Sequence, residues 1–461
     1  MQLTSPFFLF LFFPLSLPLL PLCPRRYRKL ALALLSSLWY VFANRAHPLS
    51  LLQILGVVLF VCLLSALPTR APRVRCTIGV AVPLAFLLAA RLLAEYAPIA
   101  YTYPTGLALV VLGAVSIAID RYRSDAPEQE GPLGVVAYLL FFPTMLVGPI
   151  LRYKQFLYIT DHICPDREHF SIGAQLFMLG FIKRMGIAAL LLRTLSDMLS
   201  LSQGRLPLLA FALLLAISYA LLYSFISGTT DMARGLMSIY GLRPPRAQGG
   251  AVPLLFPHRM LYGLHLSLDR YLEDYLVRPL ERIFPGRPGK LLSAALVFVL
   301  TVCFYRTRPE LLLLATPILV LALITANRNH WRRFPRHFAI RIPLSLLSLL
   351  CLSVFSLGLF LDDPLDVVVL LRSSLQGHDL YSYYHIFSSV SDTHYLVIAT
   401  VFFLLIPVSR RLPSLLHHLP PKLTFTLRIL ASLALCGGFA LTILYFLPQF
   451  PSHDPTYGAF L

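Results

Sequence analysis

The sequence predicts an all-α, polytopic integral membrane protein, and two observations support this. Of its 461 residues, 57% are hydrophobic and 13% are charged, whereas ordinary globular domains carry about 45–50% and 25%. The apolar residues also occur in runs of about 20, the length that spans the hydrocarbon core of a bilayer as a helix. We therefore expect ten or more helices around a central tunnel, with re-entrant and interfacial helices among them.

The apolar runs divide the chain into three expected regions. Residues 1–99 are expected to form N-terminal transmembrane helices, residues 100–326 an acyltransferase-like membrane core, and residues 327–461 C-terminal helices with a loop over 372–394. The first run precedes its basic residues, which favours a retained span over a cleaved signal peptide. The expected spans cover residues 3–22, 30–43, 49–68, 77–99, 103–119, 132–150, 172–200, 206–226, 291–304, 310–326, 342–361, 395–409 and 423–447.

The charge balance points to a lipid bilayer and not to nucleic acid. Lys and Arg number 39 against 21 Asp and Glu, a formal net charge of +18. In a membrane protein such an excess is typical of cytoplasmic loops that face anionic lipid. The basic stretches Arg25–Lys29 and Asn327–His337 are therefore expected to be cytoplasmic.

No metal site or bound cofactor is expected from the sequence. The seven cysteines lie mostly within apolar runs and form no C-x-x-C pair, which is typical of small hydrophobic residues in a core. His378, His385 and His394 lie among tyrosines at irregular spacing. This pattern favours an aromatic belt at the membrane surface over a zinc site.

Residues 228–285 differ from the rest of the chain because charges interrupt their helical pattern. Asp231, His265, Asp269 and Asp274 all fall in this segment. A lipid-exposed charge at the bilayer centre costs at least about 2.5 kcal/mol. The segment must therefore lie at an interface, re-enter the membrane or line a water-filled cavity, and chemistry is most expected here.

Five segments between about residues 100 and 280 carry the sequence motifs. In order they are Pro104–Gly106 leading to Ile119–Arg123, Phe141–Tyr153, Leu179–Arg184, Ser227–Gly235 and Leu264–Leu280. Together they resemble the membrane-bound O-acyltransferases, in particular the bacterial alginate acetylation proteins and D-alanyl lipoteichoic acid transferases. The last segment is the most specific, since Leu-His-Leu-Ser-Leu-Asp-Arg-Tyr-Leu-Glu-Asp-Tyr is similar to the family's W-H-I-S-L-S-x-W-F-R-D-Y.

The chain departs from this family where the catalytic histidine belongs. The family carries that histidine in a G-L-W-H-G motif some thirty to sixty residues after the W-H-I-S-L block. Here the equivalent stretch is Thr301–Pro309, which places Tyr305 on the motif's Trp and Arg306 on its His. No histidine occurs between His265 and His330.

Three residues are the catalytic candidates. Acyl transfer to a hydroxyl needs a group that takes its proton and a site that stabilises the oxyanion. Histidine suits the first role, and the resemblance implies that His265 lines the reaction tunnel; the alternative is a histidine that only hydrogen-bonds within a helix interface. Arg306 remains protonated and cannot act as a base, but its guanidinium can bind a phosphate or an oxyanion. Tyr305 is a base only if its pKa falls, which a neighbouring Arg306 would favour.

Five further residues are candidates for substrate binding or positioning. Arg152 and Lys183 are candidates for attracting a phosphate of coenzyme A or an acidic carrier protein. The alternative is that they are part of the general excess of positive charge on the cytoplasmic side of a membrane protein. Asp269 falls four residues after His265 and on a helix would share its face, where its carboxylate would orient the ring. Asp274 lies on the same predicted helix. Asp231 is expected to cap a helix start rather than to act on substrate.

The resemblance implies a membrane O-acyltransferase homologue of the bacterial inner membrane. The donor would be an acyl thioester, either acetyl-CoA or an acyl carrier, that reaches the enzyme from the cytoplasmic side. The acceptor would be a hydroxyl of an extracytoplasmic polysaccharide or envelope glycan. An extracytoplasmic esterase-like protein or a polysaccharide-synthesis protein is an expected partner. Because the catalytic histidine is missing, the alternative is a catalytically silent relative that serves as a scaffold or acyl conduit. A transporter fits the composition but leaves the His265 segment unexplained.

Overall fold

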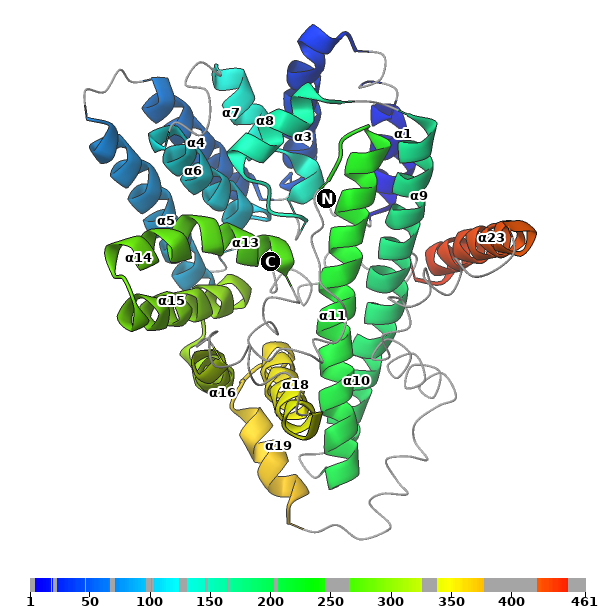
Figure 1. The fold of residues 1–461 in the computed structure, drawn as a ribbon. Helices are drawn as coiled ribbons and strands as arrows, with labels where there is room; N and C mark the ends of the chain where they lie inside the picture. The colour runs from blue at the N-terminus through cyan, green and yellow to red at the C-terminus, as the bar shows by residue number, and fades with distance from the viewer. Residues whose placement is uncertain are drawn as a thin grey trace. The chain divides into compact units, whose positions relative to one another are not determined.

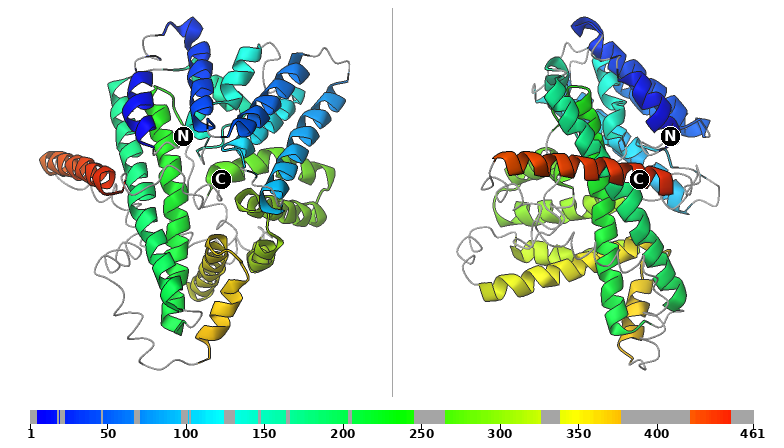
Figure 2. Two further views of the ribbon diagram at one scale, coloured as in Figure 1. Left: turned by 180° about the vertical axis from the view of Figure 1, so that it is seen from behind. Right: turned by 90° about the vertical axis from the view of Figure 1, so that its right-hand side faces the viewer.

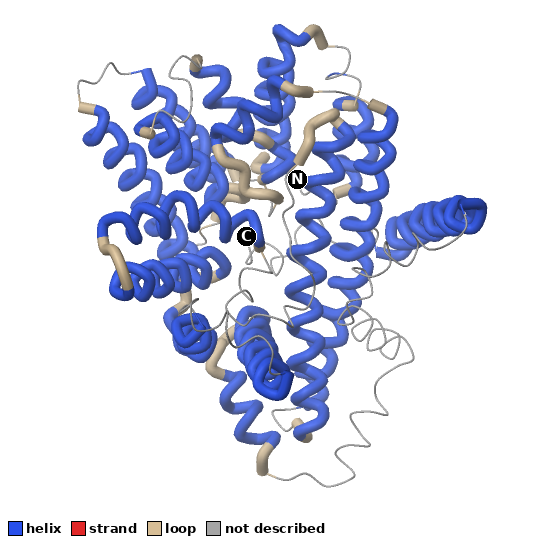
Figure 3. Tube along the Cα trace, in the orientation of Figure 1, coloured by secondary structure: helices blue, strands red, loops and turns tan. Residues whose placement is uncertain are grey.

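A computed structural model gives the fold, and its regular elements are helices. It describes residues 5–17, 19, 23–45, 47–66, 71–96, 101, 103–123, 131–145, 148–163, 166–202, 206–244, 265–325, 338–376 and 421–446. Within these ranges every regular element is helical and none is a strand, which confirms the all-α prediction (Figures 1 and 3).

The described helices agree with the prediction of ten or more. They are α1 (Phe13–Ser16), α3 (Arg28–Ala43), α4 (Pro48–Ala66), α5 (Pro72–Tyr96), α6 (Leu107–Tyr122), α7 (Pro132–Leu139), α8 (Tyr153–Asp161), α9 (Arg167–Phe181), α10 (Ala188–Ser202), α11 (Leu208–Ile239), α13 (Leu266–Leu272), α14 (Arg278–Ile283), α15 (Arg287–Tyr305), α16 (Pro309–Thr325), α18 (Phe338–Phe360), α19 (Asp366–Ser374) and α23 (Pro421–Phe446). Shorter turns are the π-helices η1 (Phe8–Phe12), η4 (Ile182–Ile187) and η6 (Glu273–Val277) and the 3-10 helices η2 (Arg25–Tyr27) and η3 (Phe142–Thr144).

Helix length and composition confirm an integral membrane protein. Five stretches within the described part of the chain are long and apolar enough to cross a bilayer: Pro48–Ala66, Pro72–Tyr96, Arg167–Ser200, Leu208–Ile239 and Arg287–Tyr305.

Three predicted segments cannot be compared with the structure. The expected span at 395–409, the basic stretch Asn327–His337 and most of the loop at 372–394 lie outside the described residues.

One expected span is not a single helix. The sequence predicts a span over 132–150, but α7 ends at Leu139 and the short turn η3 follows it. Pro143 lies in that turn and Pro149 follows Gly148. Proline has no N–H for the helical ladder and disfavours helical backbone in the residue before it, so the segment leaves the helix and continues as loop to α8.

The chain forms two compact units, and the boundary between them falls within continuous helices. Unit 1 comprises Met1–Phe181, Thr229–Ala247 and Phe439–Leu461; unit 2 comprises Ile182–Gly228 and Gln248–Gly438. The predicted central tunnel and the three predicted regions of the chain stay predictions.

In unit 1, α9 and the last third of α11 cross at two glycines and lie side by side (Figures 1 and 2). A Cβ added at Gly235 would lie 2.5 Å from the backbone nitrogen of Phe177 and 2.6 Å from the carbonyl oxygen of Gly173. A Cβ at Gly173 would lie 2.7 Å from the carbonyl oxygen of Gly235. Small residues at such crossings let two membrane helices pack backbone to backbone.

We expect Gly235→Ala to destabilise the protein by about 1–3 kcal/mol, the usual cost of overpacking, because the new methyl group meets backbone and not a movable side chain. A lower melting temperature of the detergent-purified protein would measure this loss. Gly56→Ala is the matched control, since a Cβ there meets nothing within 4 Å on the membrane helix α4. Equal melting temperatures for Gly235→Ala and Gly56→Ala would contradict the close crossing.

In unit 2, the first part of α11 packs against α18 through reciprocal serine contacts. The Ser356 hydroxyl donates to the carbonyl of Ser218 at 2.7 Å, and the Ser218 hydroxyl donates to the carbonyl of Ser353 at 3.3 Å. Helices α15, α16 and α18 follow in succession and pack pairwise (Figure 1). The predicted catalytic residues Tyr305 and Arg306 lie at the end of α15 in this group.

Candidate functional site

His265 lies at the start of α13, in unit 2, and is almost fully buried. It is the N-cap residue of that helix, 2% exposed. Its Nδ1 accepts a hydrogen bond from the backbone N–H of Leu268 at 3.3 Å and lies 3.2 Å from the Ser267 hydroxyl. The sequence predicts the residue and its helix but not this capping role.

The capping bond fixes the tautomer of a neutral His265 ring. A backbone N–H is only a donor, so Nδ1 must be the acceptor and the ring hydrogen must be on Nε2. In this arrangement Nε2 presents a hydrogen-bond donor. Nε2 becomes a base only if the hydrogen moves to Nδ1 and the bond to Leu268 is broken. The predicted role as base stays a prediction with that condition attached.

The two predicted catalytic segments meet in unit 2. The His265 ring and the Phe304 ring have centroids 6.0 Å apart and an edge-to-face arrangement. Phe304 in turn packs edge-on against Tyr305 at 5.9 Å, and Tyr305 packs against Phe355 of α18 at 6.4 Å. His265 therefore lies beside the end of α15, where the resemblance places the family's catalytic motif. Sequence reasoning did not single out Phe304, the residue that joins the segments.

Arg306 binds the end of another helix. Its guanidinium donates to the carbonyls of Leu359 at 3.2 Å and Leu361 at 3.1 Å, at the C-terminus of α18. The last carbonyls of a helix have no intrahelical partner, and a cation there also complements the helix dipole. These bonds give Arg306 a structural role at the position that the resemblance aligns with the family's histidine.

Lys183 joins two of the motif segments within unit 2. It lies in the π-helical turn η4, and its ammonium donates to the Ser227 hydroxyl at 3.1 Å. The adjacent Arg184 is buried with its guanidinium 4.1 Å from the centroid of the Phe225 ring. The Leu179–Arg184 and Ser227–Gly235 motifs therefore meet at this point. Turns of π-helix occur often at functional sites.

Asp269 and Asp274 follow His265 on α13 and η6. The backbone N–H of Asp269 donates to the carbonyl of His265 at 3.1 Å, which ties the two residues into the first helical turn. Asp274 is buried, and its carboxylate accepts from Arg278 at 2.7 Å. That Asp269 orients the His265 ring and that Asp274 binds substrate stay predictions.

The prediction that Asp231 caps a helix start is wrong. Asp231 lies inside the 32-residue helix α11, because the Ser227–Gly235 motif continues the helix where the sequence suggests a turn. Its carboxylate pairs instead with Arg234 at 3.5 Å, within unit 1. Asp231 is buried, and the pair keeps its charge from being isolated there.

Arg152 lies at the start of α8, where two motif segments lock together in unit 1. Its own N–H donates to the side chain of Gln155 at 3.2 Å. The N–H of Tyr153 donates to the Ser116 hydroxyl at 2.9 Å, and the N–H of Lys154 donates to the buried Asp120 carboxylate at 3.4 Å. The C-terminal part of α6, which carries the Ile119–Arg123 motif, thus holds the start of α8, where the Phe141–Tyr153 motif ends. Direct substrate binding by Arg152 stays a prediction.

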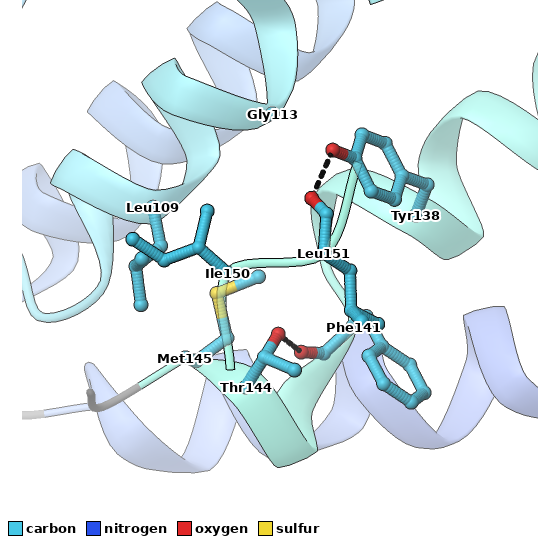
Figure 4. Close-up of a pocket in the computed structure, with 8 residues that line it drawn as sticks. All are labelled: Leu109, Gly113, Tyr138, Phe141, Thr144, Met145, Ile150 and Leu151. Atoms are coloured by element: carbon cyan, nitrogen blue, oxygen red, sulfur yellow. Dashed lines mark hydrogen bonds between the residues drawn. The ribbon is translucent and has the colours of Figure 1, made fainter. Parts of the chain in front are cut away.

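A small pocket in the same unit is built by the Phe141–Tyr153 motif (Figure 4). The Tyr138 hydroxyl donates to the carbonyl of Leu151 at 2.8 Å, and the Thr144 hydroxyl donates to the carbonyl of Phe141 at 3.0 Å. Both polar side chains are used in shaping the loop. The lining residues are Leu109, Gly113, Tyr138, Phe141, Thr144, Met145, Ile150 and Leu151.

Comparison with known proteins confirms the resemblance given by the motifs. No family model matches the chain. The chain is 30% identical over 303 residues to a probable alginate O-acetylase of Azotobacter vinelandii, covering 60% of this chain and 59% of that protein. Proteins of the same name from Pseudomonas aeruginosa and Pseudomonas syringae are each 29% identical, over 60% of this chain and 56% and 57% of their own lengths. The chain therefore spans less than three fifths of these curated relatives. These homologues confirm the resemblance to the bacterial alginate acetylation branch of the membrane-bound O-acyltransferases.

Proposed function

We propose that this protein is a membrane O-acyltransferase that moves an acyl group from a thioester donor to a hydroxyl of a polysaccharide or envelope glycan. The observation that carries the proposal is the buried His265, which is the N-cap residue of α13 and packs beside the end of α15. The homologues named alginate O-acetylase support the same reaction class. We place the protein in the bacterial inner membrane, with the donor, acetyl-CoA or an acyl carrier, on the cytoplasmic side and the acceptor outside.

The chemistry that we assign to His265 follows from its tautomer. In the reaction the acceptor hydroxyl oxygen bonds to the thioester carbonyl carbon, the carbon–sulfur bond breaks, and the hydroxyl proton ends on the thiol product. Negative charge develops on the carbonyl oxygen at the tetrahedral stage. A donor N–H in a buried, low-dielectric position stabilises that charge strongly. His265 Nε2–H is such a donor, held in place by the capping bond at Nδ1.

A second candidate function rests on Arg306. Its guanidinium is bound to two carbonyls of α18 at the position where the family carries a catalytic histidine. This arrangement favours a silent homologue that serves as a scaffold or acyl conduit for a partner. An extracytoplasmic esterase-like protein or a polysaccharide-synthesis protein fits that role.

Complementation in cells separates the two functions. We expect deletion of the gene to lower the O-acyl content of the envelope glycan, and the unmodified gene to restore it. His265→Ala should not restore the O-acyl groups if this chain performs the transfer, because the oxyanion donor is lost. Mass spectrometry of the purified glycan measures the ester groups, and an epitope tag confirms equal amounts of protein in the membrane. Full restoration by His265→Ala, together with no donor thioester hydrolysis or transfer by the purified protein, would identify the chain as a silent homologue.

A further inference from the structure

The Pro104–Gly106 motif forms the turn through which the chain enters α6. Pro104 is buried, and Gly106 is the N-cap residue of α6 with a φ of 85°. A Cβ at Gly106 would lie 2.8 Å from the Tyr40 hydroxyl and 3.3 Å from the carbonyl oxygen of Met145. Both the left-handed backbone and this close approach require glycine. The motif therefore anchors the chain where it enters α6.

Two tyrosines just before this turn contact polar side chains of α4 and α5. The Tyr101 hydroxyl donates to Gln53 Oε1 of α4 at 3.0 Å. The Arg91 guanidinium of α5 lies over the Tyr103 ring, with Cζ 5.1 Å from the ring centroid. The hydroxyls of Tyr101 and Tyr103 lie within electrostatic reach of each other. We call these four residues the tyrosine cluster; they lie in unit 1, where α4, α5 and α6 pack against one another (Figure 1).

The tyrosine cluster differs from an ordinary aromatic belt at a membrane surface. Belt tyrosines lie in the interface between lipid and water, and Tyr96 at the end of α5 fits that description because it is 59% exposed. The four cluster residues are half-buried instead and hold one another through polar and ring contacts. Side chains that are fixed in this way and still reach the surface are preorganised for a ligand.

The contacts of the cluster leave hydrogen-bonding capacity for a ligand. Because Tyr101 donates to Gln53, the tyrosine oxygen keeps its acceptor capacity, and the two hydrogens of the Gln53 amide are not used in this bond. A sugar ring needs this combination. Its C–H face packs on an aromatic ring, while the hydroxyls at its rim bond with donors and acceptors.

The charge pattern favours an extracytoplasmic position for the cluster. Four arginines lie at the opposite end of the helices, where α5 begins and α6 ends: Arg73, Arg75, Arg121 and Arg123. At the cluster end, Arg45 and Arg91 are accompanied by Glu95, and residues 97–106 between α5 and α6 contain no charged residue. Basic residues concentrate on the cytoplasmic side of membrane proteins. The cluster is then on the side of the proposed acceptor.

We propose that the tyrosine cluster is a docking site for a sugar ring of the acceptor glycan. The rings of Tyr101 and Tyr103 would pack against the C–H face of the sugar, and the Gln53 amide would donate to its hydroxyls. The Arg91 guanidinium over Tyr103 fixes the plane of that ring. This inference rests on the proposed function, which supplies the glycan, but docking is measured without acyl transfer.

Saccharide titration followed by ligand-observed NMR tests the proposal on the full-length protein in lipid nanodiscs. The probes are a hexasaccharide of alginate, which is anionic, and one of cellulose, which is neutral, in about 0.5 M salt to screen general surface charge. We expect at least one probe to bind. Tyr101→Ala and Gln53→Leu should each weaken that binding about fivefold or more, the effect of one lost hydrogen bond. Tyr96→Ala is the matched control, because it removes an exposed tyrosine from the same end of α5, and should change binding less than twofold.

Two further variants separate docking from folding and from catalysis. Tyr101→Phe keeps the ring and removes only the bond to Gln53, so it should bind more weakly than the unmodified protein and more tightly than Tyr101→Ala, at an unchanged melting temperature. His265→Ala should bind the saccharide like the unmodified protein whether or not it transfers acyl groups. A failure of the proposed function therefore leaves the docking result readable.

Three results would overturn the proposal. One is that neither saccharide binds, and another is an equal loss in Tyr96→Ala and Tyr101→Ala, which would reduce the cluster to a general aromatic surface. The third concerns the side of the membrane. Tyr101→Cys should react with a membrane-impermeant maleimide in intact spheroplasts, whereas Arg73→Cys at the opposite end of α5 should not. The reverse result would put the cluster on the cytoplasmic side, away from the glycan.

Discussion

Replacing His265 by alanine is expected to lower the rate of acyl transfer by about 10²–10⁴-fold, the range found when an oxyanion donor or a general base is removed. The residue is 2% exposed and packs beside Phe304, which shields its ring from water. The measurement is transfer from acetyl-CoA to a polysaccharide acceptor by the purified protein in lipid nanodiscs. His162→Ala, which removes an exposed histidine at the end of α8, is the control and should leave the rate unchanged.

His265→Asn distinguishes a donor from a base at the same position. Alanine removes both the reacting group and the helix cap, and cap loss alone costs about 0.5–2 kcal/mol of stability. Asparagine keeps the cap, because its carbonyl oxygen accepts from the N–H of Leu268 while its amide offers N–H groups. If His265 is a donor, His265→Asn should retain transfer within about tenfold of the unmodified protein.

A base makes the opposite prediction for the same variant. Asparagine does not take a proton at working pH, so His265→Asn would fall to the rate of His265→Ala. The melting temperature of His265→Asn should stay close to that of the unmodified protein in either case, which separates chemistry from folding. An unchanged rate in both variants would contradict any catalytic role for His265.

The sequence predicts most helices because hydrophobic periodicity and length are local signals. The run at 291–304, for example, becomes α15 over Arg287–Tyr305. The prediction fails where a local signal competes with the helix. At Pro143 and Pro149 the apolar run continues but the backbone does not, and at Asp231 polar residues suggest a turn although the helix continues through Ile239. At Asp231, burial of the helix against its neighbours outweighs the low helix propensity of the polar residues.

The candidate site is predicted only in part, because its partners lie far apart along the chain. The His265 segment is identified by its motif, and its place beside the end of α15 agrees with the resemblance. The capping bond to Leu268 depends on the ring orientation, which sequence spacing does not fix. The partners of Arg306, the carbonyls of Leu359 and Leu361, lie 53 and 55 residues further on and leave no signal in side-chain chemistry.

Arg306→His is expected to destabilise the protein and not to raise acyl transfer. From the sequence alone, this change restores the residue type that the family carries, and increased transfer would indicate a preserved site with a lost base. In the structure the guanidinium donates two hydrogen bonds to the end of α18. A neutral imidazole is shorter and has one N–H, so at least one carbonyl of Leu359 and Leu361 loses its partner.

The expected loss is about 2–4 kcal/mol, since a hydrogen bond to a charged group contributes roughly 1.5–3 kcal/mol and Arg306 is only half-buried. The melting temperature of the detergent-purified protein measures it. Arg287→Gln, which removes an exposed arginine from the start of α15, should leave that temperature unchanged. Arg306→Lys should lie between the two, because it keeps the charge, but its ammonium sits on a shorter side chain than the Nη1 that donates both hydrogen bonds.

The joint outcome of stability and transfer decides what Arg306 does. A lower melting temperature with transfer unchanged or reduced agrees with an arginine that holds α18 in place beside the His265 segment. Increased transfer in a protein of unchanged stability would show that position 306 faces the reacting atoms and that its contacts with Leu359 and Leu361 are dispensable. The capping role would then be wrong, and the missing histidine would be the reason for any weak activity of the unmodified chain.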